Sequence, residues 1–242
     1  MLSIFKREMH SYFTTSTGYI FLALSIALSA VVFGITTLMI QTSYTRYYFT
    51  VLIFMFLIFL PVLTMKTFSD EKRTKTEQLL YTSPVSMTSI VMGKFLACSA
   101  MFAIYLLLSS INFFVLFRYA ITDYYTQHSP NTPMIVGGMI ALLLVGMAFI
   151  AIGVFVSSLT ENQFAAVIIT IVVLLFFLII NLFNSMISWY PIRVILSWLS
   201  IFNRYQNFTY GVFDFGALVY YLSVMGVFLF LTVRVLDSRR YR

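Results

Sequence analysis

The stretch from Met134 to Ser158 reads MIVGGMIALLLVGMAFIAIGVFVSS and contains no Asp, Glu, Lys, Arg or His. A helix needs about 20 mostly apolar residues to cross the hydrocarbon core of a bilayer, and this stretch exceeds that length. Five more stretches meet the same requirement, at 17–40, 49–66, 95–117, 163–187 and 214–236, with charged residues only at their ends. The chain is therefore predicted to be an all-α, polytopic membrane protein with six transmembrane helices.

The composition agrees with this fold class. Hydrophobic residues make up 61% of the chain and charged residues 10%, whereas a soluble domain has about 45–50% and 25%. The net charge of +7 is typical of the basic ends that membrane proteins keep in the cytoplasm, so we expect no nucleic-acid partner. The single cysteine, Cys98, excludes a disulfide within one chain and is interpreted as a small buried residue.

The distribution of Lys and Arg predicts the orientation, because cytoplasmic loops carry the excess. With the N-terminus inside, the cytoplasmic side has Lys6, Arg7, Lys66, Lys72, Arg73, Lys75, Lys94, Arg234, Arg239, Arg240 and Arg242. The outer side has only Arg46, Arg118, Arg193 and Arg204. Both termini are therefore predicted to be cytoplasmic. The short loops leave no room for a folded soluble domain, so residues 1–242 form one transmembrane domain.

The N-terminal segment 1–16 is predicted to be an amphipathic helix in the membrane interface. Its apolar side comprises Leu2, Phe5, Met9, Tyr12 and Phe13, and its polar side comprises Arg7, Glu8, His10 and Ser11. Lys6 and Arg7 precede an apolar run that is too long for a signal peptide. A disordered tail is the alternative.

The segment 67–94 is predicted to be the longest cytoplasmic piece. Thr67 or Ser69 can cap a short helix with Asp70 and Glu71 in its first turn. Pro84 ends that helix, and Ser86 caps the helix that becomes the third span. A solvated loop is the alternative, but Leu79, Leu80, Pro84 and Val85 place apolar side chains at the turn, which favours a docking surface.

The segment 188–213 is predicted to be an extracellular re-entrant helix or helical hairpin before the last span. Pro191 suits a first helical position. One face of the segment is apolar, with Ile192, Ile195, Leu196, Leu199 and Phe202. Aromatic residues that fit the headgroup level of the membrane are Trp189, Tyr190, Trp198, Tyr205 and Tyr210.

Several kinds of site are missing from the sequence. It contains no G-x-x-x-x-G-K-[ST] phosphate-binding loop and no H-E-x-x-H zinc motif, so we expect no catalytic residue, cofactor or metal in this chain. The predicted spans also lack the midplane ionisable residues that are typical of ion-coupled carriers. Small residues in the fourth span, including Gly138, Gly146 and Gly153, predict close helix contacts within one copy or between copies.

One stretch carries a resemblance to a known family. Residues 65–86, MKTFSDEKRTKTEQLLYTSPVS, followed by VMGKFLA at 91–97, resemble the ABC-2 type permeases, and most closely the compact gliding-motility and copper-enzyme-maturation types. That family pattern has glycine where this chain has Lys75, and a different basic residue at Lys72. The opening Phe5-Lys6-Arg7-Glu8 resembles the elbow helix of the same family.

The resemblance implies partners and a mechanism. Such permeases pair with a second copy or a paralogue and bind two copies of a separately encoded ABC ATPase, which holds ATP and Mg²⁺. Segment 67–94 would be the coupling region, with Asp70, Glu71, Arg73, Thr76, Glu77, Leu79, Leu80, Pro84 and Val85 as coupling residues.

The resemblance further implies export, a bacterial inner membrane, contact with membrane lipids and room for an accessory extracytoplasmic protein. A secondary carrier or channel of another fold, or a membrane scaffold protein, is the alternative.

Overall fold

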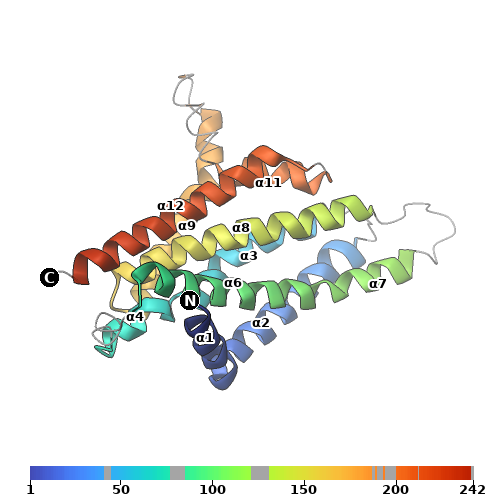
Figure 1. Ribbon diagram of the computed structural model, residues 1–242. Helices are drawn as coiled ribbons and strands as arrows, with labels where there is room; N and C mark the ends of the chain where they lie inside the picture. Colours follow the sequence, from blue (N-terminus) through green and yellow to red (C-terminus); the bar gives the residue numbers. More distant parts are fainter. Residues whose placement is uncertain are drawn as a thin grey trace.

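The computed structural model describes residues 1–40, 45–76, 85–120, 131–186, 189, 193, 200–211 and 213–240. Every regular element in these ranges is a helix (Figure 1). In chain order they are α1 (Leu2–Thr14), α2 (Ser16–Phe33), the π-helix η1 (Gly34–Leu38), α3 (Arg46–Thr64), α4 (Lys66–Arg73), α6 (Met87–Ser109), α7 (Ile111–Ala120), α8 (Thr132–Leu159), α9 (Gln163–Met186), α11 (Ile201–Thr209) and α12 (Phe215–Arg240).

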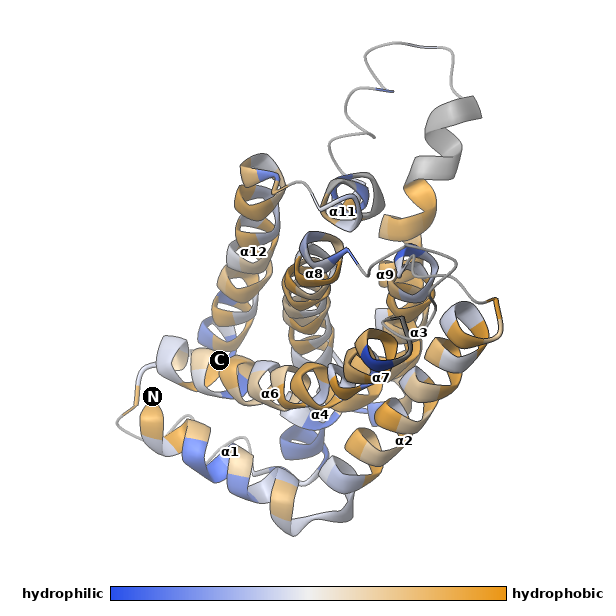
Figure 2. Cartoon of the chain, turned by 90° about the vertical axis from the view of Figure 1, so that its right-hand side faces the viewer, coloured by the Kyte–Doolittle hydropathy of each residue, from blue (hydrophilic) through white to orange (hydrophobic). Residues whose placement is uncertain are grey.

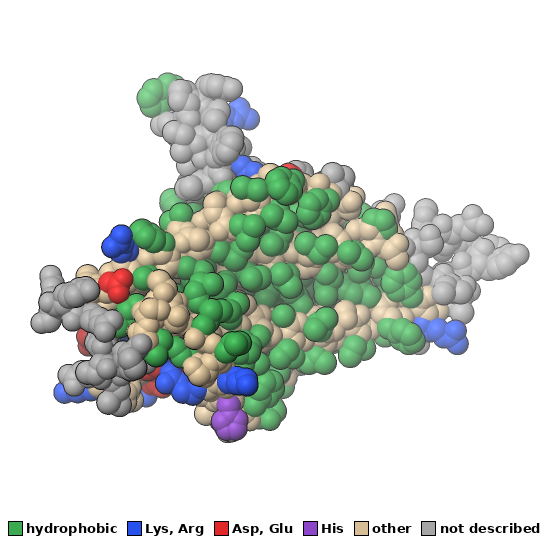
Figure 3. Space-filling model, in the orientation of Figure 1, with side chains coloured by type: hydrophobic (Ala, Val, Ile, Leu, Met, Phe, Trp, Pro, Cys, Tyr) green, Lys and Arg blue, Asp and Glu red, His purple; other side chains and the backbone are tan. Residues whose placement is uncertain are grey.

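Six helical stretches are long and apolar enough to cross a membrane, which confirms the predicted number of spans within the described residues. They are Ser16–Leu38, Arg46–Arg73, Met87–Arg118, Thr132–Leu159, Gln163–Ile180 and Phe215–Arg239. On the face shown in Figure 3, apolar side chains cover the surface between the two ends of the bundle, and most charged side chains lie near the ends. This distribution is typical of helices surrounded by lipid.

Helix α8 lies at the centre of the bundle, as the end-on view shows (Figure 2). It packs against α3, α4, α6, α9, α11 and α12, and it is the most buried of the six candidate spans. Its glycines make these contacts possible. A Cβ atom on Gly138 would collide with the Phe49 ring of α3, one on Gly146 with the Phe102 ring of α6, and one on Gly153 with Thr64 of α3. The predicted close contacts therefore occur within one copy.

The first span departs from a regular α-helix, because it ends in the π-helix η1. In the third span, Ser110 stands between α6 and α7 and keeps right-handed helical angles. Pro61 lies inside α3, one turn before that helix ends at Thr64. Beside Ser110, the second and third spans are held together by the Tyr48 hydroxyl and Ser109 Oγ, which are 2.9 Å apart and buried.

The predicted re-entrant segment is described only in part. Residues 187–188, 190–192 and 194–199 lie outside the described residues, so the proposed apolar helix face stays a prediction. Within the segment, α11 packs against α8 and α9. Trp189 and Tyr210 are exposed, as an aromatic belt requires, but Tyr205 is buried. Its assignment to the belt is wrong, because α11 turns Tyr205 inward with Ile201 and Phe208.

Candidate functional site

Helix α4 extends the second span at the end of the bundle where both α1 and the C-terminal end of α12 lie (Figure 1). Met65, between α3 and α4, keeps right-handed helical angles, so the helix does not restart there. The prediction that Thr67 or Ser69 caps a new helix is therefore wrong. Both lie inside α4, where Thr67 Oγ1 donates to the Thr64 carbonyl at 2.7 Å and Ser69 Oγ donates to the Met65 carbonyl.

A serine from α8 joins α4 to the centre of the bundle. Ser157 Oγ accepts the backbone N–H groups of Phe68 at 3.1 Å and Ser69 at 3.2 Å. It also donates to the Met65 carbonyl at 3.1 Å. Ser157 is fully buried, so these bonds are made without competition from water. One hydroxyl thus fixes the start of α4 against the end of the central helix.

Two further bonds connect α4 to α8 and α9. Lys72 Nζ donates to the Ser158 carbonyl at 2.5 Å. The Gln163 amide, in the first turn of α9, donates to Asp70 Oδ1 at 2.6 Å. Asp70 Oδ1 also accepts from Arg73 at 3.0 Å. Helix α4 is therefore bonded along its length to two spanning helices.

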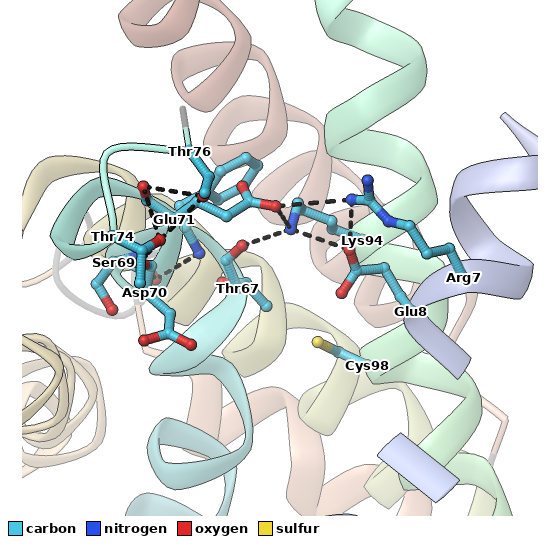
Figure 4. Close-up of polar contacts among 12 residues, drawn as sticks. Arg7, Glu8, Thr67, Ser69, Asp70, Glu71, Thr74, Thr76, Lys94 and Cys98 are labelled. Atoms are coloured by element: carbon cyan, nitrogen blue, oxygen red, sulfur yellow. Dashed lines mark hydrogen bonds and ion pairs between the residues drawn. The ribbon is translucent and has the colours of Figure 1, made fainter. Parts of the chain in front are cut away.

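A buried lysine connects the opposite side of α4 to α1 and α6 (Figure 4). Lys94, from α6, has only 2% of its side chain exposed. Its Nζ donates to Glu71 Oε1 at 2.8 Å, to Glu8 Oε1 at 3.1 Å and to the Thr67 carbonyl at 2.7 Å. An ammonium has three donors, so all of them are used. We call Lys94, Glu8 and Glu71 the ionic cluster.

The α1 partner in the ionic cluster is also paired with Arg7. Arg7 Nη2 lies 2.9 Å from Glu8 Oε1 and 3.6 Å from Glu71 Oε1. Burial alone would raise the pKa of the Glu8 carboxyl, but Lys94 and Arg7 outweigh it and hold the pKa below its usual value. Glu8 is thus an anion at neutral pH, and the cluster is an ion pair network.

Part of the predicted apolar side of α1 faces the protein, together with one residue that was assigned to the polar side. The half-buried side of α1 comprises Ile4, Phe5, Glu8, Met9 and Tyr12, whereas Leu2, Phe13, Lys6 and Arg7 are exposed. Glu8, assigned to the polar side, therefore points into the protein. The close approach of α1 to α6 needs a glycine, because a Cβ on Gly93 would lie 2.9 Å from Ile4 Cγ2.

The segment after α4 contains Lys75, the position at which the family pattern has glycine. Lys75 has a φ of 56°, the left-handed conformation that glycine adopts most easily after a helix. The Lys75 N–H donates to the Lys72 carbonyl and the Thr76 N–H to the Glu71 carbonyl, both at 3.0 Å. The glycine of the family pattern thus corresponds to a helix C-cap position, which lysine occupies here.

The predicted coupling residues are only partly placed by the structure. Asp70, Glu71 and Arg73 lie on α4, and Thr76 follows it. Val85 packs against the core just before α6. Glu77, Leu79, Leu80 and Pro84 lie outside the described residues, and their role stays a prediction. The prediction that Ser86 caps the third span is confirmed, since its hydroxyl accepts the Ser89 N–H at 3.4 Å.

The sequence interpretation missed three residues of this site: Lys94, Ser157 and Gln163. Lys94 was assigned to the end of a cytoplasmic loop, although it lies within the Gly-Lys-Phe part of the family pattern. Ser157 and Gln163 lie at the boundaries of apolar runs, where polar residues are ordinary. Within the described ranges, no three His, Cys, Asp or Glu side chains lie close enough together to hold a metal ion.

The chain matches a known protein family. A family described as "ABC-2 family transporter protein" matches residues 32–235. This range includes α4, Lys94 and Ser157, and it covers most of the chain. No curated protein matches the chain.

Proposed function

The chain belongs to the ABC-2 family of transporter proteins, and on this premise we propose that it is the membrane permease of an exporter driven by a separate ABC ATPase. The permease domain itself is a membrane subunit of a kind that is typically not catalytic. ATP and Mg²⁺ would bind in the ATPase, two copies of which would associate with a pair of permease chains. The resemblance of residues 65–86 to the gliding-motility and copper-enzyme-maturation types supports that subtype.

The observation that carries this proposal is the attachment of α4 to its neighbours. A coupling element must transmit the movement of a partner to the spanning helices, so its own contacts with those helices must be rigid. Helix α4 is bonded to α8 through Ser157, to α9 through Gln163, and to α6 and α1 through Lys94. Displacement of α4 would therefore act on four helices at once.

The exposed side of the same region offers a surface for the partner. Arg73 has 65% of its side chain exposed, and Lys75 and Thr76 are exposed just beyond it. We propose that the ATPase contacts this surface together with the segment 77–85, where Leu79 and Leu80 supply an apolar anchor. In interfaces of this kind, apolar anchors contribute most of the affinity and the surrounding charges set the orientation.

Association with an ATPase can be tested directly. We expect the permease, purified from native membranes in mild detergent, to bring down a nucleotide-binding protein with the phosphate-binding loop that this chain lacks. Recovery of the permease without any such protein would contradict the proposed function.

A matched pair of variants makes the same experiment specific to α4. Ser157→Ala removes the bonds to Met65, Phe68 and Ser69, whereas Ser158 Oγ bonds, among the described residues, only to Phe155 of its own helix. We expect both variants to bind the ATPase. Permease-dependent ATP hydrolysis in proteoliposomes should fall several-fold for Ser157→Ala and stay normal for Ser158→Ala. Equal rates would argue against coupling through α4.

The proposed orientation places both termini and α4 in the cytoplasm of a bacterial cell, as the distribution of Lys and Arg predicts. Single cysteines at positions 3, 129 and 238 in a Cys98→Ser background test it. We expect a membrane-impermeant thiol reagent added outside to label position 129 only. Labelling of position 3 or 238, with position 129 protected, would reverse the orientation.

A further inference from the structure

A polar cavity of about 420 Å³ lies between α1, the start of α2, α4 and α6. Its volume falls within the range of small-molecule sites, roughly 300–1,000 Å³. Its lining residues are Arg7, Glu8, Ser11, Tyr12, Thr15, Thr17, Lys66, Thr67, Asp70, Glu71 and Lys94. No aliphatic side chain is among them, so the cavity suits a polar or charged ligand.

The cations of this lining are not equivalent. Lys94 is buried and uses all three of its donors within the protein. Lys66 is half-buried and has neither an ion pair nor a side-chain hydrogen bond among the described residues. Arg7 is more than half exposed, and its ion pairs use only Nη2. Lys66 and Arg7 therefore have donors available for an anionic group such as a phosphate.

The three carboxylates leave acceptors available as well. Within the described part of the chain, Glu8 and Glu71 accept only through Oε1, and Asp70 only through Oδ1. Because three cations face three carboxylates, the formal charge of the lining sums to zero. Such a lining favours a ligand that carries both charges over a net anion.

Helix α2, whose first turn lines the cavity through Thr17, carries exposed apolar side chains further along its length. Phe13 and Tyr19 lie on either side of the α1–α2 junction with their rings 6.1 Å apart, edge to face. Tyr19, Ile20 and Leu24 are exposed along α2, which is one of the six candidate spans. An acyl chain can therefore lie along α2 while its headgroup enters the cavity.

We infer that this cavity binds the headgroup of a zwitterionic phospholipid with a primary amine, of the phosphatidylethanolamine type. Lys66 and Arg7 would hold the phosphate, and the free carboxylate oxygens would accept from the ammonium. A choline headgroup fits less well, because its quaternary nitrogen has no N–H donor and prefers a cage of aromatic rings. This lining contains a single aromatic residue, Tyr12.

The inference can be tested on the purified, delipidated permease without the ATPase, so its failure would leave the proposed function untouched. Native mass spectrometry would measure retention of phosphatidylethanolamine, phosphatidylcholine and phosphatidylglycerol with identical acyl chains. We expect phosphatidylethanolamine to be retained preferentially. Lys66→Gln should weaken its retention about tenfold, the loss expected for one charge-assisted hydrogen bond.

Lys66→Gln is a safe variant for folding, since that side chain makes no ion pair in the described structure. Its matched control is Lys6→Gln, an exposed lysine of α1 outside the lining, which should leave retention unchanged. Equal retention of the three lipids, preference for phosphatidylglycerol, or indifference to Lys66→Gln would each overturn the inference. If soluble phosphoethanolamine displaced the lipid at the same concentration as the lipid itself, the ligand would be a soluble phosphate ester instead.

Discussion

Replacing Lys94 with methionine is expected to destabilise the permease by about 3–5 kcal/mol, the usual cost of removing one partner from a buried ion pair. Methionine fills a similar volume but leaves Glu8 and Glu71 without the ammonium that bonds both of them. Arg7 is the only other cation paired with them in the described structure, and it is largely exposed. Thermal unfolding of the purified protein would measure the loss.

A matched control separates burial of the charge from its mere presence. Arg73→Met removes an ion-paired cation of α4 itself, but the pair that Arg73 forms with Asp70 is exposed. Exposed pairs contribute only about 0.2–1 kcal/mol, so we expect a small change. If Lys94→Met and Arg73→Met unfolded at the same temperature, the ionic cluster would have no special role in stability.

A triple variant separates stability from coupling. Lys94→Met combined with Glu8→Met and Glu71→Met removes the three charges of the ionic cluster, and replacing a buried ion pair network with apolar residues of similar volume is often neutral for stability. We expect this variant to fold and to bind the ATPase, but to hydrolyse ATP without normal coupling to the permease, because α1 and α6 are no longer held to α4. Normal coupling in the triple variant would restrict the cluster to a role in folding.

Replacing Gly146 with leucine is expected to prevent correct packing of the bundle. A Cβ atom at this position already overlaps the Phe102 ring, and the remaining atoms of leucine add to the collision. Neighbouring rings restrict the movement of Phe102, because its ring centroid lies 5.0 Å from that of Phe56 and 6.0 Å from that of Tyr105. Overpacking by one or two methylene groups costs about 1–3 kcal/mol, so leucine should exceed that range.

The control for this variant lies in another span. In the described part of the chain, no atom lies within 4 Å of where a Cβ on Gly226 of α12 would stand, so Gly226→Leu should fold and melt like the original protein. The yield of monodisperse protein and its melting temperature would distinguish the two variants. Rescue of a milder Gly146→Ala variant by Phe102→Leu would confirm the contact between α8 and α6. Equal melting temperatures of the two leucine variants would contradict it.

Parts of the site could be predicted because they depend on neighbours in the sequence. Ser86 caps α6 through a residue three positions away. The predicted N-terminal helix forms as α1. The apolar pattern placed Glu8 on the polar side of α1, because Glu8 is charged and its buried partner, Lys94, lies in another helix. The sequence could not show that Ser157, in a distant helix, would accept the backbone N–H groups of Phe68 and Ser69, so Thr67 and Ser69 were the only caps it offered.

The sequence by itself determined that this is a six-span, all-helical membrane protein, since each span needs only its own run of apolar residues and satisfies its backbone hydrogen bonds internally. The glycines of Met134–Ser158 indicated close packing, but only the tertiary structure selected Phe49, Phe102 and Thr64 as the partners. The same holds for the ionic cluster, in which Lys94 lies 86 residues from Glu8 and 23 from Glu71 in the chain. A charged side chain at the end of an apolar run costs little free energy when water surrounds it and much more when it is buried. Whether Lys94 is buried depends on the packing of α1 and α4 over it.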